Sequence, residues 1–172
     1  MEVRVLTQAD AEPFRKLRRE RLDDSPRAFG ESIAECESLS VSAAVARLGS
    51  LSGDNFVVGA FETGELAGMA GFARNLREKS NHKGLIWGVY VRPAFRGQGV
   101  ARALFEVLLE RARSQPGLEQ ILLTVAVEQT AAKRLYRSLG FEVFGHERHA
   151  LKVDGAYVDE DHMVLWLGAV AG

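Results

Sequence analysis

A short glycine-rich segment is the part of the sequence best suited to chemistry. Residues 91–101 read VRPAFRGQGVA, and they lie between an apolar strand pattern and a helical pattern. Glycines let the backbone approach a ligand closely, and the unpaired N–H groups in the first turn of a helix attract anions, above all phosphate. Arg96 adds a guanidinium, which binds phosphate in a bidentate manner. The segment therefore predicts a phosphate or pyrophosphate site.

The details separate the known kinds of phosphate-binding loop. A Walker-type loop needs Gly-Lys followed by Ser or Thr, which residues 99–101 lack. A dinucleotide fingerprint needs a third glycine at Arg102 and an acidic residue at the end of the next strand, where Glu128 comes about ten residues too late. A pyrophosphate loop of an acyl-coenzyme A binder fits better. A purely structural turn between strand and helix is the remaining alternative.

A second motif occurs further along the chain, where residues 129–141 read QTAAKRLYRSLGF. Together the two motifs resemble the GNAT N-acetyltransferase superfamily. The loop pattern of that family is Arg or Gln, two residues, Gly, one residue, then Gly or Ala, and Arg96, Gly99 and Ala101 match it. The second motif is similar to the family's segment that ends in Leu-Tyr, two residues, then Leu-Gly-Phe. The family usually has Asn at the position of Gln129.

The resemblance implies an α/β fold (an α+β mixed sheet) and an acetyl-CoA-dependent enzyme without a metal, which transfers acetyl directly to a small-molecule or peptide amine. In that fold the strands at 88–91 and 123–127 splay apart, and Gly88 suits the bulge that starts the splay. Exposed backbone groups of this strand would bind the pantetheine arm, and the loop amides would bind the pyrophosphate. The implied coenzyme-binding residues are Val89, Tyr90, Val91, Arg96, Gly97, Gln98, Gly99, Val100, Ala101, Gln129 and Lys133.

Tyr136 is the catalytic residue that the resemblance implies, because its phenol would lie near the coenzyme sulfur and could protonate the leaving thiolate. The alternative is a packing role, since Ala132, Leu135 and Leu139 form an apolar stripe on the same helix. Lys133 has a similar alternative as a solvated surface residue.

A base for the incoming amine is harder to find. Many family members have a Glu on the strand before the loop, but residues 85–92 contain no carboxylate. Water, a group from elsewhere, or an amine that is already neutral would have to serve, and His82 titrates near neutrality. A non-catalytic acyl-CoA-binding or sensor domain is therefore the alternative function.

The acceptor site in the family fold lies between the first two helices and the last hairpin. Arg18 and Arg21 fall on the apolar face of the first helix, where a charge is usually paired. Glu31 or Glu35 is the expected partner, and a carboxylate on the substrate is the alternative for Arg18. We therefore treat Arg18, Glu31 and Glu35 as candidate acceptor-binding residues.

Hydrophobic periodicity predicts the element order β-α-α-β-β-β-α-β-α-β-β. The predicted strands are 2–6, 56–61, 65–73, 85–92, 121–127, 141–149 and 157–167. The predicted helices run from the Thr7 cap to about Leu22, over 31–48 with a break near 39–41, from Gly97 to the Pro116-Gly117 pair, and over 130–139.

Composition narrows the functional classes. The 172 residues are 47% hydrophobic, and the net charge of −1 lacks the basic surplus of a general nucleic-acid binder. The single Cys36 excludes an internal disulfide and a Cys-rich zinc site, and we expect a small buried hydrophobe there. The longest apolar run, 121–127, is too short for a membrane span.

We expect one domain over residues 1–172, a cytoplasmic location, and no membrane or nucleic-acid partner. Apolar residues 164–167 hint at a homodimer.

Overall fold

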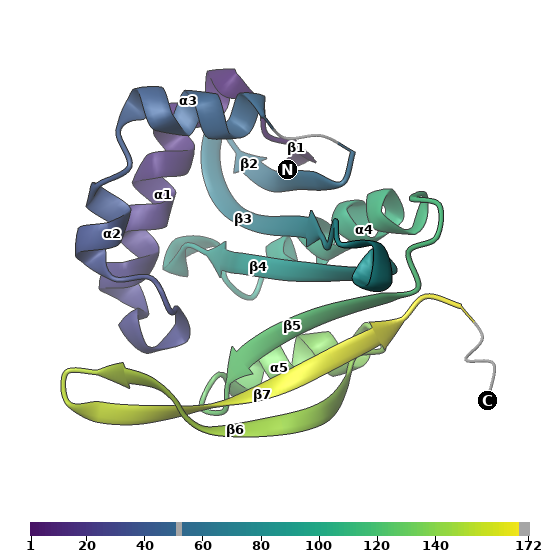
Figure 1. Ribbon diagram of the computed structural model, residues 1–172. Coiled ribbons are helices and arrows are strands. Elements are labelled where there is room, and N and C mark those ends of the chain that lie inside the picture. The colour runs from purple at the N-terminus through teal and green to yellow at the C-terminus, as the bar shows by residue number, and fades with distance from the viewer. Residues whose placement is uncertain (51–52, 169–172) are drawn as a thin grey trace.

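A seven-stranded mixed sheet forms the centre of the computed structural model, which describes residues 1–50 and 53–168 (Figure 1). The strands are ordered β1-β2-β3-β4-β5-β7-β6, and only the β4–β5 pair is parallel. The strands are β1 (Glu2–Val5), β2 (Asn55–Glu62), β3 (Glu65–Arg74), β4 (Lys83–Val91), β5 (Gln120–Ala126), β6 (Glu142–Val153) and β7 (Ala156–Trp166). The α-helices are α1 (Ala11–Asp24), α2 (Ile33–Glu37), α3 (Val41–Gly49), α4 (Val100–Arg113) and α5 (Thr130–Ser138).

The predicted fold class and the predicted order of elements along the chain are confirmed, but the start of α4 and the length of the last hairpin differ. The break predicted near 39–41 within the helical stretch 31–48 is confirmed, because the Ser40 side chain accepts a hydrogen bond from the Ala43 amide and starts α3 anew. Helix α4 begins at Val100 rather than at Gly97, since Gly97 and Gly99 have φ of 75° and 82°, outside the helical region. The last hairpin is longer than predicted.

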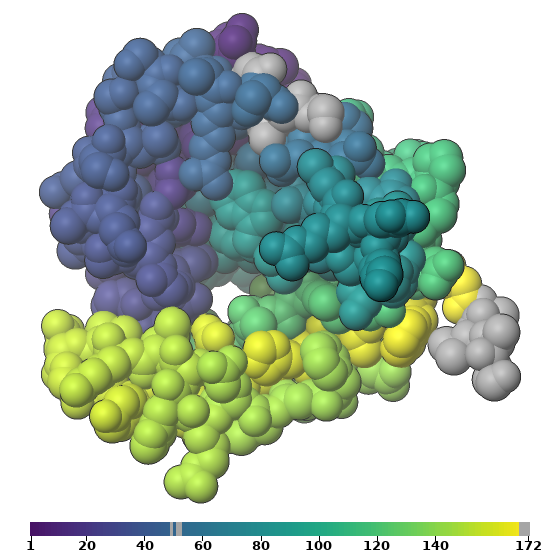
Figure 2. Space-filling view, in the orientation of Figure 1, coloured from purple at the N-terminus to yellow at the C-terminus, as the bar shows by residue number. Residues whose placement is uncertain are grey.

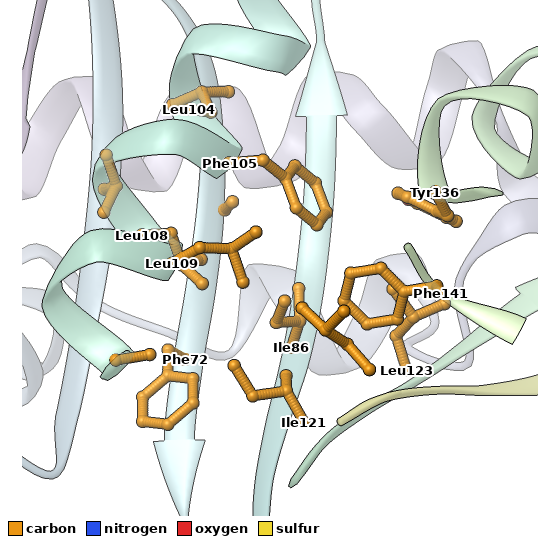
Figure 3. Close-up of a cluster of buried hydrophobic side chains, with 14 of the residues drawn as sticks. Phe72, Ile86, Leu104, Phe105, Leu108, Leu109, Ile121, Leu123, Tyr136 and Phe141 are labelled. Atoms are coloured by element: carbon orange, nitrogen blue, oxygen red, sulfur yellow. The ribbon is translucent and has the colours of Figure 1, made fainter. Parts of the chain in front are cut away.

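Helices pack on both faces of the sheet, which explains the apolar runs in its central strands. On one face, α4 buries Leu104, Phe105 and Leu108 against strand residues such as Phe72 and Ile86 (Figure 3). On the other face, α1 and α3 pack on a second buried cluster, made of Leu6, Ala11, Phe14, Leu17, Ala44, Leu48, Val57, Leu66, Met69 and Tyr90. Each large apolar side chain that is buried in this way contributes roughly 1.5–3 kcal/mol.

Strands β4 and β5 part soon after they meet. They pair only from Lys83 to Leu85, while β5 stays paired with β7 along its whole length (Figure 1). Gly88 has a φ of 63°, and the β3–β4 register shifts at this point, so β4 bulges as predicted. One edge of β4 beyond Leu85 is therefore left without a strand partner.

Candidate active site

A cavity of about 300 Å³ lies where β4 and β5 part. Its walls come from α1, the α1–α2 connection, β4, β5, α5 and β7. In the space-filling view, a hollow separates the N-terminal helices from the C-terminal hairpin (Figure 2). A second cavity, of about 590 Å³, lies between residues 29–34 and the end of β6, and both cavities are lined by residues 29–31. The separation of the strands thus produces a site that opens toward the hairpin.

The open edge of β4 presents backbone groups to this site. The Arg92 amide donates to Ala67 on β3, and the Tyr90 carbonyl also faces β3. Because hydrogen-bonding groups alternate along a strand, those of Val89 and Val91 face the open side. Val89 lines the cavity, whereas the Val91 carbonyl already accepts a hydrogen bond from Arg96 Nε at 2.9 Å. The buried Tyr90 ring belongs to the core, and burial, followed by the charge of Asp24, raises its pKa to about 12.

The glycine-rich loop leads from β4 into α4. A Cβ atom at Gly97 or Gly99 would meet nothing within 4 Å, so a ligand can reach the backbone at both positions. The first helical hydrogen bond runs from the Ala103 amide to the Gly99 carbonyl. The amides of residues 100–102 precede it and therefore have no partner within the helix. The loop backbone is thus open where the sequence predicts an anion site, although the Arg96 amide already donates to the Pro93 carbonyl. Gln98 donates from its side chain to the Ala94 carbonyl and stabilises the loop itself.

Tyr136 lies between the core and the cavity. Its side chain is buried against Phe105 and Phe141, and the same residue lines the cavity (Figure 3). Burial raises the pKa of the phenol, which therefore stays protonated over the physiological range. Tyr136 thus packs in the core, as one predicted alternative has it, and also lies at the cavity.

The structure separates the two other candidates on α5. Gln129, the residue before the helix, lines the cavity. Lys133 forms an ion pair with Asp161 on β7, and the Asp161 carboxylate also accepts a hydrogen bond from His146 Nδ1 at 2.9 Å. The ammonium of Lys133 is therefore paired with Asp161 and is not among the groups that line this cavity, and its contact with the coenzyme phosphates or adenylate stays a prediction.

The arginines of α1 are paired as expected. Arg18 and Arg21, each 5% exposed, form ion pairs with the same carboxylate, that of Glu31. Of these residues, Arg21 and Glu31 line the cavity, whereas Arg18 is not among the lining residues. Glu35 does not belong to the site, because it is exposed and its carboxylate accepts from the Ser32 amide at 2.7 Å to cap α2.

Glu160 is the site residue that the sequence analysis missed. It lies on β7, is half-buried and lines the same cavity as Tyr136. The neighbouring Asp161 points to α5, where it binds Lys133, so alternation directs Glu160 to the opposite face of the sheet. Burial raises the pKa of the Glu160 carboxyl, and the negative charge of Glu147 raises it further. A raised pKa is typical of carboxylates that accept protons in catalysis.

Two other candidates lie away from the cavity. His82 precedes β4 at the end where β4 and β5 are paired, and its carbonyl accepts from the Glu119 amide at 2.8 Å. His82 lies six positions before Gly88 along the strand, a distance of roughly 20 Å, so it cannot act there as a base. Cys36 is buried, as expected.

Within residues 1–50 and 53–168 there is no cluster of potential metal ligands, and no helix has the length and apolar character of a membrane span.

Comparison with solved structures shows the class of fold. The structure superposes on a GNAT-family acetyltransferase from Streptococcus pneumoniae with a TM-score of 0.85 at 22% identity, covering 96% of this chain and 98% of that one. A phosphinothricin acetyltransferase from Sinorhizobium meliloti, solved in complex with acetyl-CoA, gives a TM-score of 0.83 at 23% identity, covering 97% of this chain and 88% of that one. The fold is that of the GNAT acetyltransferases.

Comparison of sequences shows the family. The model of the acetyltransferase (GNAT) family matches residues 14–141. The chain is also 33% identical over 156 residues to the N-alpha-acetyltransferase RimI of Mycobacterium tuberculosis, covering 88% of this chain and 85% of that protein. The chain therefore belongs to the GNAT family, and it is an acetyltransferase.

Proposed function

We propose that this acetyltransferase binds acetyl-CoA along the open edge of β4 and transfers the acetyl group directly to an amine in the cavity beside Tyr136 and Glu160. The separation of β4 from β5 carries the proposal, because it leaves backbone groups of Val89 free beside the cavity. These groups would bind the pantetheine arm as an added strand would.

The loop residues Gly97 to Ala101 fit the pyrophosphate. Their open backbone positions and the unpaired amides at the start of α4 suit an anion, and the helix dipole adds favourable charge. The Arg96 side chain is held at the same place by the Val91 carbonyl and by its ion pair with Asp24. It would contribute positive charge from a fixed position rather than as a free side chain.

Tyr136 and Glu160 would serve the two ends of the reaction. The amine nitrogen forms a bond to the acetyl carbon as the carbon–sulfur bond breaks, and the proton that nitrogen loses balances the proton that sulfur gains. Glu160 would accept the proton on the amine side. Tyr136 would donate a hydrogen bond to the sulfur, which develops negative charge. Full transfer of its proton would be uphill, because a thiol has a pKa near 8.5 and burial raises the pKa of the phenol. The thiolate that leaves would therefore take its proton from water.

Turnover of acetyl-CoA with a panel of amines tests this function. The panel contains free amino acids, peptide N-termini and polyamines, and thiol release is followed with and without each amine. We expect amine-dependent thiol release and an acetylated product by mass spectrometry. Tight acetyl-CoA binding by calorimetry without turnover on any amine would instead favour the alternative, a non-catalytic acyl-CoA-binding domain.

The sequence-based expectations of a cytoplasmic location and a homodimer have different support. A cytoplasmic location remains part of the proposal. The dimer hint loses its basis, since Val164 and Leu165 are 4% and 6% exposed inside this chain and offer no apolar surface to a second copy. Trp166 is more exposed, but its indole N–H donates to Glu142 on β6.

A further inference from the structure

Two buried arginines share a single carboxylate beneath the cavity. Arg18 and Arg21 both pair with Glu31, and each is 5% exposed. Within the described part of the chain, Nε and Nη1 of Arg18 and Nε of Arg21 are buried without a hydrogen-bond partner. A buried guanidinium is costly unless it is fully paired. One carboxylate does not complete the pairing of two such cations, so this part of the site has capacity for another anion.

Arg21 is the member of the pair that reaches the cavity. Its guanidinium lies over the ring of Phe29, 4.5 Å from the ring centroid, which fixes its orientation. Its Nη1 atom lies 2.9 Å from the position that a Cβ would take at Gly88, beside the bulge where β4 turns away. Only the absence of a side chain at Gly88 makes room for this group. Arg21 therefore presents its Nη1 end next to the edge of β4 that would bind the acetyl donor.

Glu160 presents the opposite charge to the same cavity. It comes from β7, and within the described residues no ion pair joins it to Arg21 or to any other cation. Glu31 is the remaining charged residue in the lining, and Arg18 and Arg21 already bind it. The cavity thus holds a cation on one wall and an anion on another that do not neutralise each other. Such an arrangement is complementary to a molecule that carries both charges.

We propose that the acceptor is a free α-amino acid or a close analogue, whose carboxylate binds Arg21 and whose amine faces Glu160. This inference rests on the acetyl transfer proposed above and names its substrate class. A guanidinium binds a carboxylate with strong, directional hydrogen bonds. A polyamine would instead bring a second cation toward Arg21, and a peptide N-terminus would bring a neutral amide carbonyl. Both would leave Arg21 with only the Glu31 carboxylate, which it shares with Arg18.

A matched series of acceptors tests the proposal. One amino acid is compared with its amide, with the amine that lacks its carboxylate, and with a dipeptide that begins with the same residue. Values of kcat/KM are expressed per neutral amine, because these compounds differ in pKa. We expect the amino acid to exceed the other three by about 100-fold, since a site built for a hydrogen-bonding group rejects analogues without it.

The variant Arg21→Gln isolates the guanidinium. We expect kcat/KM for the amino acid to fall about 100-fold, mostly through KM, while values for the amide change less than about threefold. Arg21→Lys should restore part of the preference. Arg27→Gln is the matched control, because Arg27 pairs with Glu128 outside the cavity lining and its loss should leave the preference unchanged. Circular dichroism and acetyl-CoA affinity verify that each variant is folded.

Several results would overturn the proposal. Equal or better use of the amide, dipeptide or a polyamine by the wild-type protein would do so while leaving acetyl transfer intact, and this comparison needs no folded variant. An equal fall in kcat for every acceptor in Arg21→Gln would show that Arg21 acts on the acetyl group instead. Absence of turnover with every acceptor would refute the proposed function itself.

Discussion

The ring of Tyr136 packs against that of Phe105, with centroids 5.3 Å apart and planes inclined by 43°. Phe141 adds a third ring, 6.1 Å from Tyr136. Aromatic pairs of this kind contribute about 0.5–1.5 kcal/mol each beyond their buried area. The position of Tyr136 is thus set by its ring, and its hydroxyl can be removed without loss of these contacts.

Tyr136→Phe therefore separates catalysis from packing. We expect kcat to fall at least about tenfold, because the sulfur loses a hydrogen-bond donor as charge develops on it. Acetyl-CoA affinity and thermal stability should change little. Tyr157→Phe is the control, since Tyr157 is 51% exposed at the hairpin. Steady-state kinetics of both variants measure this difference. Full activity of Tyr136→Phe would show that Tyr136 has only a packing role.

Gly99→Asp tests the anion site of the loop. Gly99 has a φ of 82°, and an aspartate there would add strain and a negative charge where pyrophosphate should bind. We expect calorimetry to show loss of acetyl-CoA binding, with the fold largely retained.

Gly117→Asp is the control for this experiment, because Gly117 has a φ of 72° and lies beyond the other end of α4. It adds the same charge and a similar strain at a distance of roughly 20 Å. Unchanged acetyl-CoA affinity in Gly99→Asp, or an equal loss in both variants, would refute the loop assignment.

Glu160→Gln tests the base through the pH profile. A base must be deprotonated, so kcat/KM should rise with pH through the Glu160 pKa, which burial and the charge of Glu147 raise. Arg21 and Glu31 also face the cavity, and His162 lowers this pKa. In Glu160→Gln we expect this rising limb to disappear and kcat/KM to fall at least about tenfold.

Glu147→Gln provides the matched control. Glu147 lies directly opposite Glu160 in the β6–β7 register, and its side chain is 53% exposed. Removal of its charge should lower the Glu160 pKa and move the rising limb to lower pH, with activity retained. If the rising limb follows only the acceptor's own pKa in the wild type and in both variants, no protein base acts. That result would agree with the lack of a carboxylate in residues 85–92.

Asp10→Asn tests how much the buried carboxylate before α1 contributes to the stability of the protein. Asp10 is 6% exposed, and its two carboxylate oxygens accept from Arg4 at 2.8 Å each. The hydrogen bond from Arg4 lowers the Asp10 pKa against the effect of burial. The pair should therefore stabilise the protein above about pH 4, the unfolded value, and this contribution is lost as pH falls through the folded pKa.

We expect Asp10→Asn to lower the free energy of unfolding at pH 7 by about 2 kcal/mol, and by less under acid conditions. Urea denaturation at several pH values measures both. Glu12→Gln is the control, because Glu12 lies in the first turn of α1 and pairs only with the exposed Arg15. It should change stability by less than about 0.5 kcal/mol. Equal effects of Asp10→Asn at neutral and acid pH would contradict the assignment.

Local signals in the sequence were enough for the order of helices and strands along the chain, the glycine loop and the helix that carries Tyr136. Periodicity reports which residues face the core, and the capping box of Thr7 and Asp10 marks the start of the first helical segment, as the structure confirms. The Gly88 bulge was predictable once the family resemblance was recognised. Such features depend on neighbours in the chain, and for that reason they can be read from the sequence.

The charges in the site required the tertiary structure. Lys133 and Asp161 are distant in sequence, and only the packing of α5 on β7 brings them together. Glu160 reaches the cavity because the β5–β7 pairing sets which strand residues face it, while no local pattern distinguishes it from any exposed glutamate. The sequence by itself determined the family, the loop and Tyr136. The tertiary structure decided which charged groups meet, because ion pairs and burial depend on distances between segments that only folding fixes.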